Sequence, residues 1–176
     1  MTAQQRVLVA HASELGSTAE VARAIGVELR ACGAMVEVMP VVEVKDLRAF
    51  DAAIIGSPIY NGRWLPEAIH FVEFHVTELS RMPVAYFLVS ATARDGSEQS
   101  RRNARSLLDP LLTSMPQVAP VEIGLFGGQI DVHKLPWSVR LRIRLLTTLR
   151  HGDYRDWEAI RAWTRHTAPR LGVQNQ

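Results

Sequence analysis

The sequence predicts an α/β fold in which a five-stranded parallel sheet is covered by helices on both faces. Short runs rich in Val, Ile and Ala alternate with longer stretches of helical periodicity. The short runs are mostly apolar throughout, which is typical of strands that are buried on both sides. We find no internal repeat, low-complexity segment or linker, so residues 1–176 are expected to form a single domain.

The first three strands and the first helix are predicted in the N-terminal third of the chain. Arg6–His11 has the composition of a buried strand. Ser17–Ala31 has apolar residues four apart, which predicts a helix, and Gly33 follows where a helix C-terminal cap is expected. Met35–Met39 and the apolar run Ala52–Gly56 are predicted to be the second and third strands.

The central part of the chain predicts two helices and two strands. Pro66–Leu79 is expected to be a helix that begins with Pro at its first position, where Pro is favoured. Val84–Ser90 is the predicted fourth strand. Ser97–Met115 is predicted to be mostly helical, with an interruption near Pro110. Val118–Phe126 completes the sheet as the fifth strand.

The C-terminal part of the chain departs from this alternation. The last helix is expected at Asp153–Arg170, with Asp153 and Asp156 placed to cap its first turn. Gln129–Gly152 lies between the fifth strand and this helix and is interpreted as an insert in the fold. Within it, Trp137–Arg150 is predicted to be a helix whose apolar residues cover most of its circumference.

The insert is also basic. Residues 1–90 carry seven Lys/Arg and ten Asp/Glu, whereas residues 91–176 carry thirteen and eight. The stretch 133–150 contains no acid and five basic residues, namely Lys134, Arg140, Arg142, Arg144 and Arg150. Two interpretations remain open: this helix packs on the domain, or it contacts an anionic membrane surface and makes the protein peripheral on the inner face of the membrane.

Composition excludes several classes of protein. Hydrophobic residues make up 47% and charged residues 22% of the chain, which excludes wholesale disorder. The longest apolar runs are about six residues, too short to span a membrane, and the polar N-terminus does not resemble a secretory signal. Cys32 is the single cysteine, and the six histidines show no metal-ligand spacing, so we expect no disulfide, no metal site and a cytoplasmic location.

The loops that follow the strands form the candidate site, because ligands of open parallel sheets bind at the carboxyl ends of the strands. The first loop, His11–Thr18, offers hydroxyl groups, a glycine and the N–H groups of a helix N-terminus, which together favour a phosphate. It has neither the Gly-Lys-Ser/Thr of a Walker loop nor the G-x-G-x-x-G of a dinucleotide site. The alternative is that Ser13 or Ser17 simply caps the helix.

The loop after the third strand, Gly56–Trp64, contains aromatic residues suited to a flat ring. Tyr60 and Trp64 are expected to cover such a ring, and backbone groups of residues 59–62 to hydrogen-bond the edge of a heterocycle. The alternative is that these aromatic side chains pack into the core. The loop after the fourth strand, Ser90–Gly96, is small and polar, and it allows a ligand to approach its backbone closely.

These loops together resemble those of flavodoxins. Ser13, Gly16 and Thr18 match the S-x-x-G-x-T pattern of the flavodoxin phosphate loop. Over nearly the whole chain the sequence is similar to the flavodoxin-domain branch that includes menaquinone-dependent protoporphyrinogen IX dehydrogenases; the matching segments are Gly56–Trp64, Pro66–Ala68 and Gly152–Trp157. Glu14 and Leu15 depart from the usual phosphate loop, which has small hydroxyl residues there.

The resemblance implies a flavodoxin-like fold with FMN as the cofactor. It implies that the first loop binds the FMN phosphate, through Ser13, Glu14, Leu15, Gly16, Ser17 and Thr18. It implies that the other two loops flank the flavin ring, through Ser57, Pro58, Ile59, Tyr60, Asn61, Gly62, Ser90, Ala91, Thr92, Ala93, Arg94, Asp95 and Gly96. No catalytic side chain is identified, because FMN carries the chemistry. Arg63 and Arg94 are candidate contacts to substrate carboxylates.

Three functions remain possible at this point. The first is an FMN-dependent oxidoreductase of heme biosynthesis that passes electrons from a porphyrinogen-like small molecule to a quinone. The second is an electron-transfer flavodoxin without a substrate of its own; the basic C-terminal half argues against it, since such carriers usually present an acidic face. The third is a domain that has lost the cofactor, left open by Glu14 and Leu15. No nucleic acid partner is expected.

Overall fold

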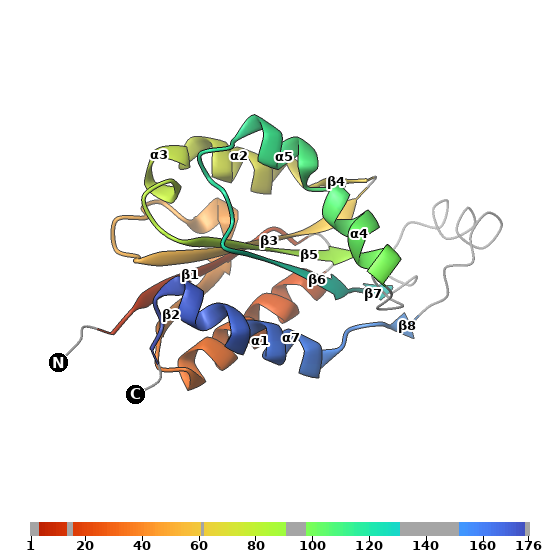
Figure 1. Cartoon of the computed structure of the whole chain (residues 1–176), viewed down its shortest axis with the longest axis horizontal. Helices are drawn as coiled ribbons and strands as arrows, with labels where there is room; N and C mark the ends of the chain where they lie inside the picture. Colours follow the sequence, from red (N-terminus) through yellow and green to blue (C-terminus); the bar gives the residue numbers. More distant parts are fainter. Residues whose placement is uncertain (1–3, 14–15, 61, 91–97, 131–151, 175–176) are drawn as a thin grey trace.

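Five parallel strands form the central sheet in the computed structural model of the chain, which describes residues 4–13, 16–60, 62–90, 98–130 and 152–174 (Figure 1). Their order in the sheet is β2-β1-β3-β5-β6. The strands are β1 (Arg6–His11), β2 (Met35–Pro40), β3 (Ala52–Tyr60), β5 (Val84–Ser90) and β6 (Glu122–Gly127). A short strand, β4 (Arg63–Trp64), runs antiparallel to the end of β3. This order is flavodoxin-like, so the predicted fold class is confirmed.

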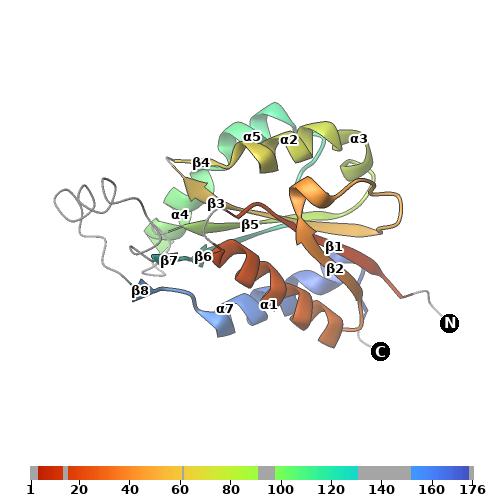
Figure 2. The ribbon, with the colours of Figure 1, turned by 180° about the vertical axis from the view of Figure 1, so that it is seen from behind.

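Helices cover both faces of this sheet, as Figures 1 and 2 show. One face carries α1 (Ser17–Ala31) and α7 (Trp157–Thr167). The other face carries α2 (Pro66–Phe74), α3 (Val76–Leu79) and α5 (Asp109–Ser114), and α4 (Glu98–Ser106) contacts β6. Short 3₁₀ turns occupy Val41–Glu43 and Ala168–Leu171.

Two apolar cores lie between the sheet and its helices. In β1, Val7 and Val9 belong to the core under α1 and α7, whereas Leu8 and Ala10 belong to the opposite core. All seven residues of β5 are buried, because this strand lies inside the sheet and helices cover both of its faces. Burial on both sides is why the strands appear in the sequence as apolar runs without alternation.

Several local predictions are confirmed. Helix α1 has the predicted bounds, and Gly33 just beyond it adopts φ +98°, the left-handed conformation that ends many helices. Asp156 caps α7, since its carboxylate accepts a hydrogen bond from Ala159 N–H at 2.9 Å. Pro110 lies in the first turn of α5, so the predicted interruption divides this region into α4 and α5.

Other boundaries differ from the prediction. The helix predicted at Pro66–Leu79 is broken at His75, whose φ of −101° and ψ of 19° lie outside the helical region. Strand β6 begins at Glu122 instead of Val118. Pro120 has no N–H to donate to the sheet, and pairing starts with the bond from Val121 N–H to Val84 C=O at 2.7 Å.

The start of the last helix is also later than predicted. Helix α7 begins at Trp157, and Asp153 does not cap it, because its carboxylate is bound by Arg155. The helical path continues after Thr167 as the 3₁₀ turn, and Pro169 lies within that turn.

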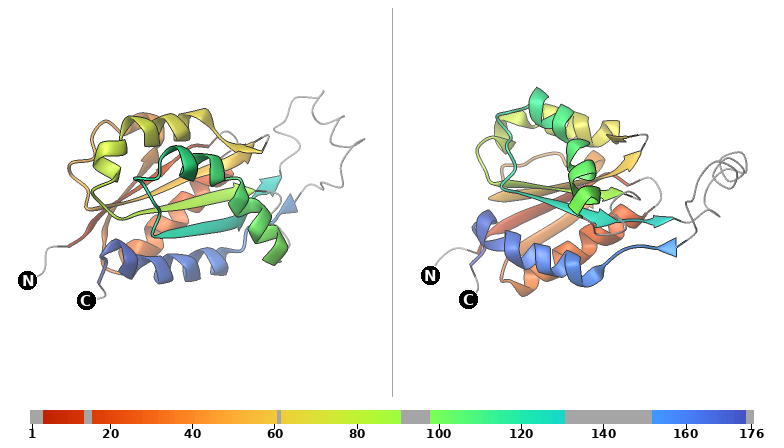
Figure 3. Two further views of the ribbon diagram at one scale, coloured as in Figure 1. Left: turned by 45° about the horizontal axis from the view of Figure 1, so that its top comes forward. Right: turned by 45° about the vertical axis from the view of Figure 1, so that its right-hand side comes forward.

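A two-stranded antiparallel ribbon closes the base of the insert. Strand β7 (Gln129–Ile130) pairs with β8 (Gly152–Asp153), so the two ends of the insert lie side by side at the same end of the sheet as β4 (Figure 3). The backbones are close here, because a Cβ at Gly127 would stand 2.1 Å from the carbonyl oxygen of Tyr154. The predicted helix Trp137–Arg150 lies outside the described residues, and its two interpretations stay open.

Candidate functional site

The carboxyl ends of β1, β3 and β5 meet at one edge of the sheet. His11 is paired in register with Gly56, and Pro58 with Val89. Ala12 N–H donates to Gly56 C=O at 2.9 Å, which holds the first loop against the third strand. Strands β2 and β3 lie on opposite sides of β1, so this edge contains the switch point at which doubly wound sheets bind ligands.

The described ends of the first loop, Ser13 and Gly16, are joined by a hydrogen bond, and Gly16 leads directly into α1. The Ser13 hydroxyl accepts a hydrogen bond from Gly16 N–H at 3.1 Å. Gly16 adopts φ +95°, a left-handed conformation that glycine reaches without strain, and it is the residue before the first turn of α1. No side chain of the described residues caps this helix, so the alternative of capping by Ser13 or Ser17 is not what the structure shows.

This helix N-terminus has the chemistry of an anion site. The bond from Glu20 N–H to Gly16 C=O, at 3.1 Å, closes the first turn of the helix, and the preceding N–H groups belong to the four that a helix leaves without internal acceptors. A Cβ at Gly16 would meet no atom within 4 Å, so the space beside it is open. Ser13 and Ser17 are half-buried, whereas Thr18 is 1% exposed. An uncapped, partly exposed turn of this kind fits a phosphate.

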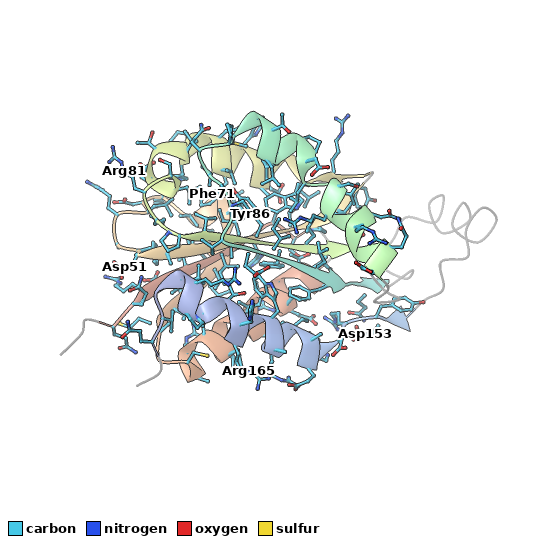
Figure 4. All side chains as sticks on the ribbon, in the orientation of Figure 1. Asp51, Phe71, Arg81, Tyr86, Asp153 and Arg165 are labelled. Atoms are coloured by element: carbon cyan, nitrogen blue, oxygen red, sulfur yellow. The ribbon has the colours of Figure 1, made fainter. Side chains whose placement is uncertain are left out.

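The second loop presents one of its two aromatic residues to solvent. Tyr60, at the end of β3, is 43% exposed. Trp64 is 4% exposed and packs edge-on against Tyr86, with ring centroids 5.3 Å apart, so core packing is the interpretation that holds for it. Figure 4 shows Tyr86 and Phe71 directed into this layer between the sheet and α2. Tyr60 is therefore the aromatic residue available to a flat ring here.

Backbone and hydroxyl groups shape the rest of this loop. Ser57 is fully buried; its hydroxyl accepts from Leu65 N–H and donates to Pro58 C=O, both at 3.0 Å, so this side chain holds the β3–β4 hairpin. Pro58 and Ile59 are half-buried. Gly62 adopts φ +76°, and a Cβ there would meet no atom within 4 Å. The backbone at the tip of the hairpin is thus open to a ligand.

The remaining predicted residues can be placed only in part. Ser90 is buried at the end of β5, beside the other two loops. Arg63 is exposed on β4 and paired in register with Tyr60. The residues that lie outside the described part of the chain are Glu14, Leu15, Asn61, Ala91, Thr92, Ala93, Arg94, Asp95 and Gly96.

His11 is a buried residue of this edge that sequence reasoning did not single out. It is 7% exposed, and its Nδ1 atom has no hydrogen-bond partner. Burial, with a smaller contribution from the Arg23 charge, lowers the pKa of His11 below its ordinary value. The imidazole is therefore neutral near pH 7, directly before the phosphate-type loop. The sequence signal that could have identified His11 is its position as a titratable residue at the end of an apolar run.

Arg155 links the base of the insert to the same helix N-terminus. Its guanidinium holds both oxygens of Asp153, with Nε to Oδ1 at 2.7 Å and Nη2 to Oδ2 at 2.6 Å, and also pairs with Glu20 in the first turn of α1. It lies over the Trp157 ring, 4.5 Å from the centroid. The side chain is 6% exposed, and its hydrogen bonds to Asp153 raise the pKa of Arg155 and lower that of Asp153.

Two other types of site receive no support in the described part of the chain. Its His, Cys, Asp and Glu side chains form no group of three or more that is arranged to hold a metal ion. None of its helices is both long and apolar enough to cross a membrane.

Comparisons with known proteins agree with this architecture. The family model described as "Flavodoxin domain" matches residues 8–156. The protoporphyrinogen IX dehydrogenase [quinone] of Leishmania major is 25% identical in an alignment of 134 residues that covers 69% of this chain and 57% of that longer relative.

Solved structures are similar in fold. A flavodoxin from the domain Archaea has a TM-score of 0.58 and 17% identity, and the match covers 96% of this chain and 99% of that one. A Streptococcus pneumoniae flavodoxin has a TM-score of 0.58 and 16% identity over 94% of this chain and 99% of that one. The rubredoxin oxygen:oxidoreductase of Desulfovibrio gigas has a TM-score of 0.56 and 16% identity over 96% of this chain but 37% of its own.

Proposed function

Because the chain belongs to the flavodoxin domain family, we propose that it is an FMN-dependent oxidoreductase that passes electrons from a reduced small molecule to a quinone-type acceptor. The observation that carries this proposal is the N-terminus of α1 at the switch point of the sheet, which no described side chain caps and where the Ser13 hydroxyl holds Gly16 N–H. Tyr60, exposed at the same edge, supplies an aromatic face for the flavin.

The described residues fit FMN. Ser13, Gly16 and the first turn of α1 would hold the phosphate, and the hydroxyl of Ser13 keeps its own proton to donate while it accepts from Gly16 N–H. The β3–β4 hairpin and the end of β5 would flank the ring. When bound, FMN supplies the redox chemistry, and the protein supplies orientation and electrostatics.

Charges around the helix N-terminus support binding of a phosphate. Glu20 places a carboxylate in the first turn of α1, where it would repel a phosphate, and Arg155 pairs with that carboxylate. His11 stays neutral beneath the loop, because burial lowers its pKa. The positive end of the helix dipole is thereby left to act on the anion.

The nature of the substrate rests on the relative and on Arg63. The relative's name assigns it protoporphyrinogen IX and a quinone, and we propose the same classes for this chain. Arg63 is an exposed cation directly across the hairpin from Tyr60, a position suited to a substrate carboxylate. The alternative, a flavodoxin-type carrier, is less well supported because the sequence pI is about 9.0 and carriers dock through acidic surfaces.

Turnover under anaerobic conditions tests this proposal. FMN-loaded protein is mixed with protoporphyrinogen IX and menadione, and formation of protoporphyrin is followed by its fluorescence. We expect oxidation faster than in a control with free FMN, and Arg63→Gln should raise KM more than it lowers kcat. A rate equal to that with free FMN, from protein that nevertheless binds FMN, would favour the carrier.

A further inference from the structure

A cavity of about 380 Å³ opens on the far side of the β3–β4 hairpin from the helix α1. It lies between β4, α2 and the turn from α4 to α5, elements that lie together in Figures 1 and 3. Its lining residues are Arg63, Trp64, Ile69, Leu107, Pro110, Leu111 and Ser114. None of these residues is among those predicted to bind FMN.

The lining combines an apolar body with few polar groups. Five of its seven residues are apolar. The Ser114 hydroxyl donates its proton to Leu111 C=O at 3.0 Å, so towards a ligand it can act only as a hydrogen-bond acceptor. Arg63 is exposed and forms no ion pair within the described ranges. Trp64 belongs to the apolar part of the lining, because its Nε1 atom is fully buried and does not reach the cavity. This is the pattern of a small-molecule pocket: an apolar wall and a few polar groups that fix orientation.

The size and the charge of the cavity select the class of ligand. Ligand pockets commonly have volumes of about 300–1,000 Å³, so this one is suited to a mono- or bicyclic ring rather than to a tetrapyrrole. The Arg63 guanidinium is the hydrogen-bond donor of this lining, and it favours a ring that carries an acceptor oxygen. A flat apolar ring of one or two cycles with carbonyl oxygens matches both the volume of the cavity and its hydrogen-bond donor.

The cavity lies next to the proposed flavin site, on the other strand of the β3–β4 hairpin. Ile59 is paired in register with Trp64, and Tyr60 with Arg63, so each residue of β4 that lines the cavity lies opposite a residue predicted to flank the ring. Cross-strand neighbours of this kind have Cα atoms about 4.5–5.5 Å apart. A ligand in the cavity therefore lies behind the two-stranded hairpin whose other strand belongs to the proposed flavin site.

We propose that this cavity binds the bicyclic ring of a quinone-type acceptor. The choice of a quinone rests on the proposed function, whereas the size, the apolar wall and the Arg63 donor are properties of the cavity alone. Arg63 hydrogen-bonds a carbonyl oxygen of the ring at the mouth, and the ring packs between Ile69 and Leu111. The larger reduced substrate lies on the exposed side of the hairpin, beside Tyr60, and Arg63 contacts this substrate and the quinone in turn, one in each half-reaction.

Calorimetric titration of the FMN-loaded protein with menadione tests the site. In Leu107→Trp the larger side chain fills the cavity from the half-buried turn between α4 and α5, and we expect the heat of binding to disappear. Thr113→Trp is the matched control, since Thr113 is exposed on the adjoining helix and does not line the cavity. Arg63→Met should raise the Kd of menadione about tenfold, the effect of one lost hydrogen bond from a charged donor.

The outcomes separate this inference from the proposed function. Loss of binding in Leu107→Trp, with unchanged binding in Thr113→Trp and unchanged circular dichroism in both, supports the cavity as the site. Equal binding by the two variants, or no binding by the wild type, overturns it. Reoxidation of the reduced flavin by menadione is measured separately: if it persists at the wild-type rate in Leu107→Trp, the acceptor reacts elsewhere and the proposed function stands without this cavity.

Discussion

Arg155→Ala should destabilise the fold far more than removal of a surface arginine from the helix that follows it, α7. The Arg155 guanidinium is 6% exposed, it is held by Asp153 and Glu20, and it lies on Trp157. Removing one partner of a buried pair costs about 3–5 kcal/mol, because the other charges lose their compensation. The Asp153 and Glu20 side chains are 43% and 48% exposed, so water can solvate them once Arg155 is removed. We therefore expect the free energy of unfolding to fall by about 2–3 kcal/mol, at or below the lower end of that range.

Arg161→Ala provides the matched comparison. Arg161 is exposed on α7 and pairs with Glu158 at 2.9 Å, an ion pair of the kind that contributes about 0–1 kcal/mol. Urea unfolding of the FMN-free proteins, followed by circular dichroism, gives both free energies. If the two variants lose the same stability to within about 0.5 kcal/mol, Arg155 is an ordinary surface residue and the reasoning fails.

The same substitution should weaken FMN binding. Without Arg155, the carboxylate of Glu20 stands uncompensated in the first turn of α1. Charges at a helix terminus change energies by about 0.3–1 kcal/mol, which predicts an FMN Kd about two- to fivefold higher. Arg161→Ala should leave this Kd unchanged, and equal Kd values for the two variants would contradict a role for Arg155 beside the phosphate.

Three further predictions concern single side chains. Ser13→Ala removes a hydroxyl that would donate to the phosphate and should raise the FMN Kd by at least about tenfold by fluorescence titration; the control Ser80→Ala, next to Arg81 at the opposite end of the sheet (Figure 4), should not. The pKa of Asp153 is lowered by its hydrogen bonds to Arg155, so this contact stabilises the fold above pH about 4 and is lost as pH falls further. In Asp153→Asn the free energy of unfolding should therefore fall less steeply as the pH is lowered below about 4. The same pH dependence as in the wild type would show that the pair contributes nothing. Burial raises the pKa of the Cys32 thiol, so alkylation at pH 8 should be slow in the native protein and fast in urea; similar rates in both would mean that Cys32 is not packed in the core.

The central architecture could be predicted from the sequence because it follows from local patterns. Strands buried on both faces appear as apolar runs, and a helix between two of them implies a parallel crossover. Helix α1 was predicted with its bounds, because its apolar spacing and Gly33 are both local signals. The position of the three loops at one edge of the sheet could be predicted from the order of strands and helices along the chain, because the carboxyl ends of parallel strands lie at the same edge.

The features that were missed depend on contacts between distant residues. Strand β4 is two residues long, too short for any periodicity, and it exists because Ser57 and Leu65 hold the hairpin. Arg155 and Glu20 are 135 residues apart in sequence, so no local pattern joins them. For Trp64 the sequence left both a ring contact and core packing open, and its contact with Tyr86, a residue 22 positions away, places it in the core.

Titration of the FMN-free protein with FMN tests the central claim most directly. The account predicts that flavin fluorescence is quenched on binding and that the titration saturates at one FMN per chain. It also predicts that added inorganic phosphate competes, because the N-terminus of α1 is the anchor. Flavin fluorescence that stays equal to that of free FMN at every protein concentration would contradict the account.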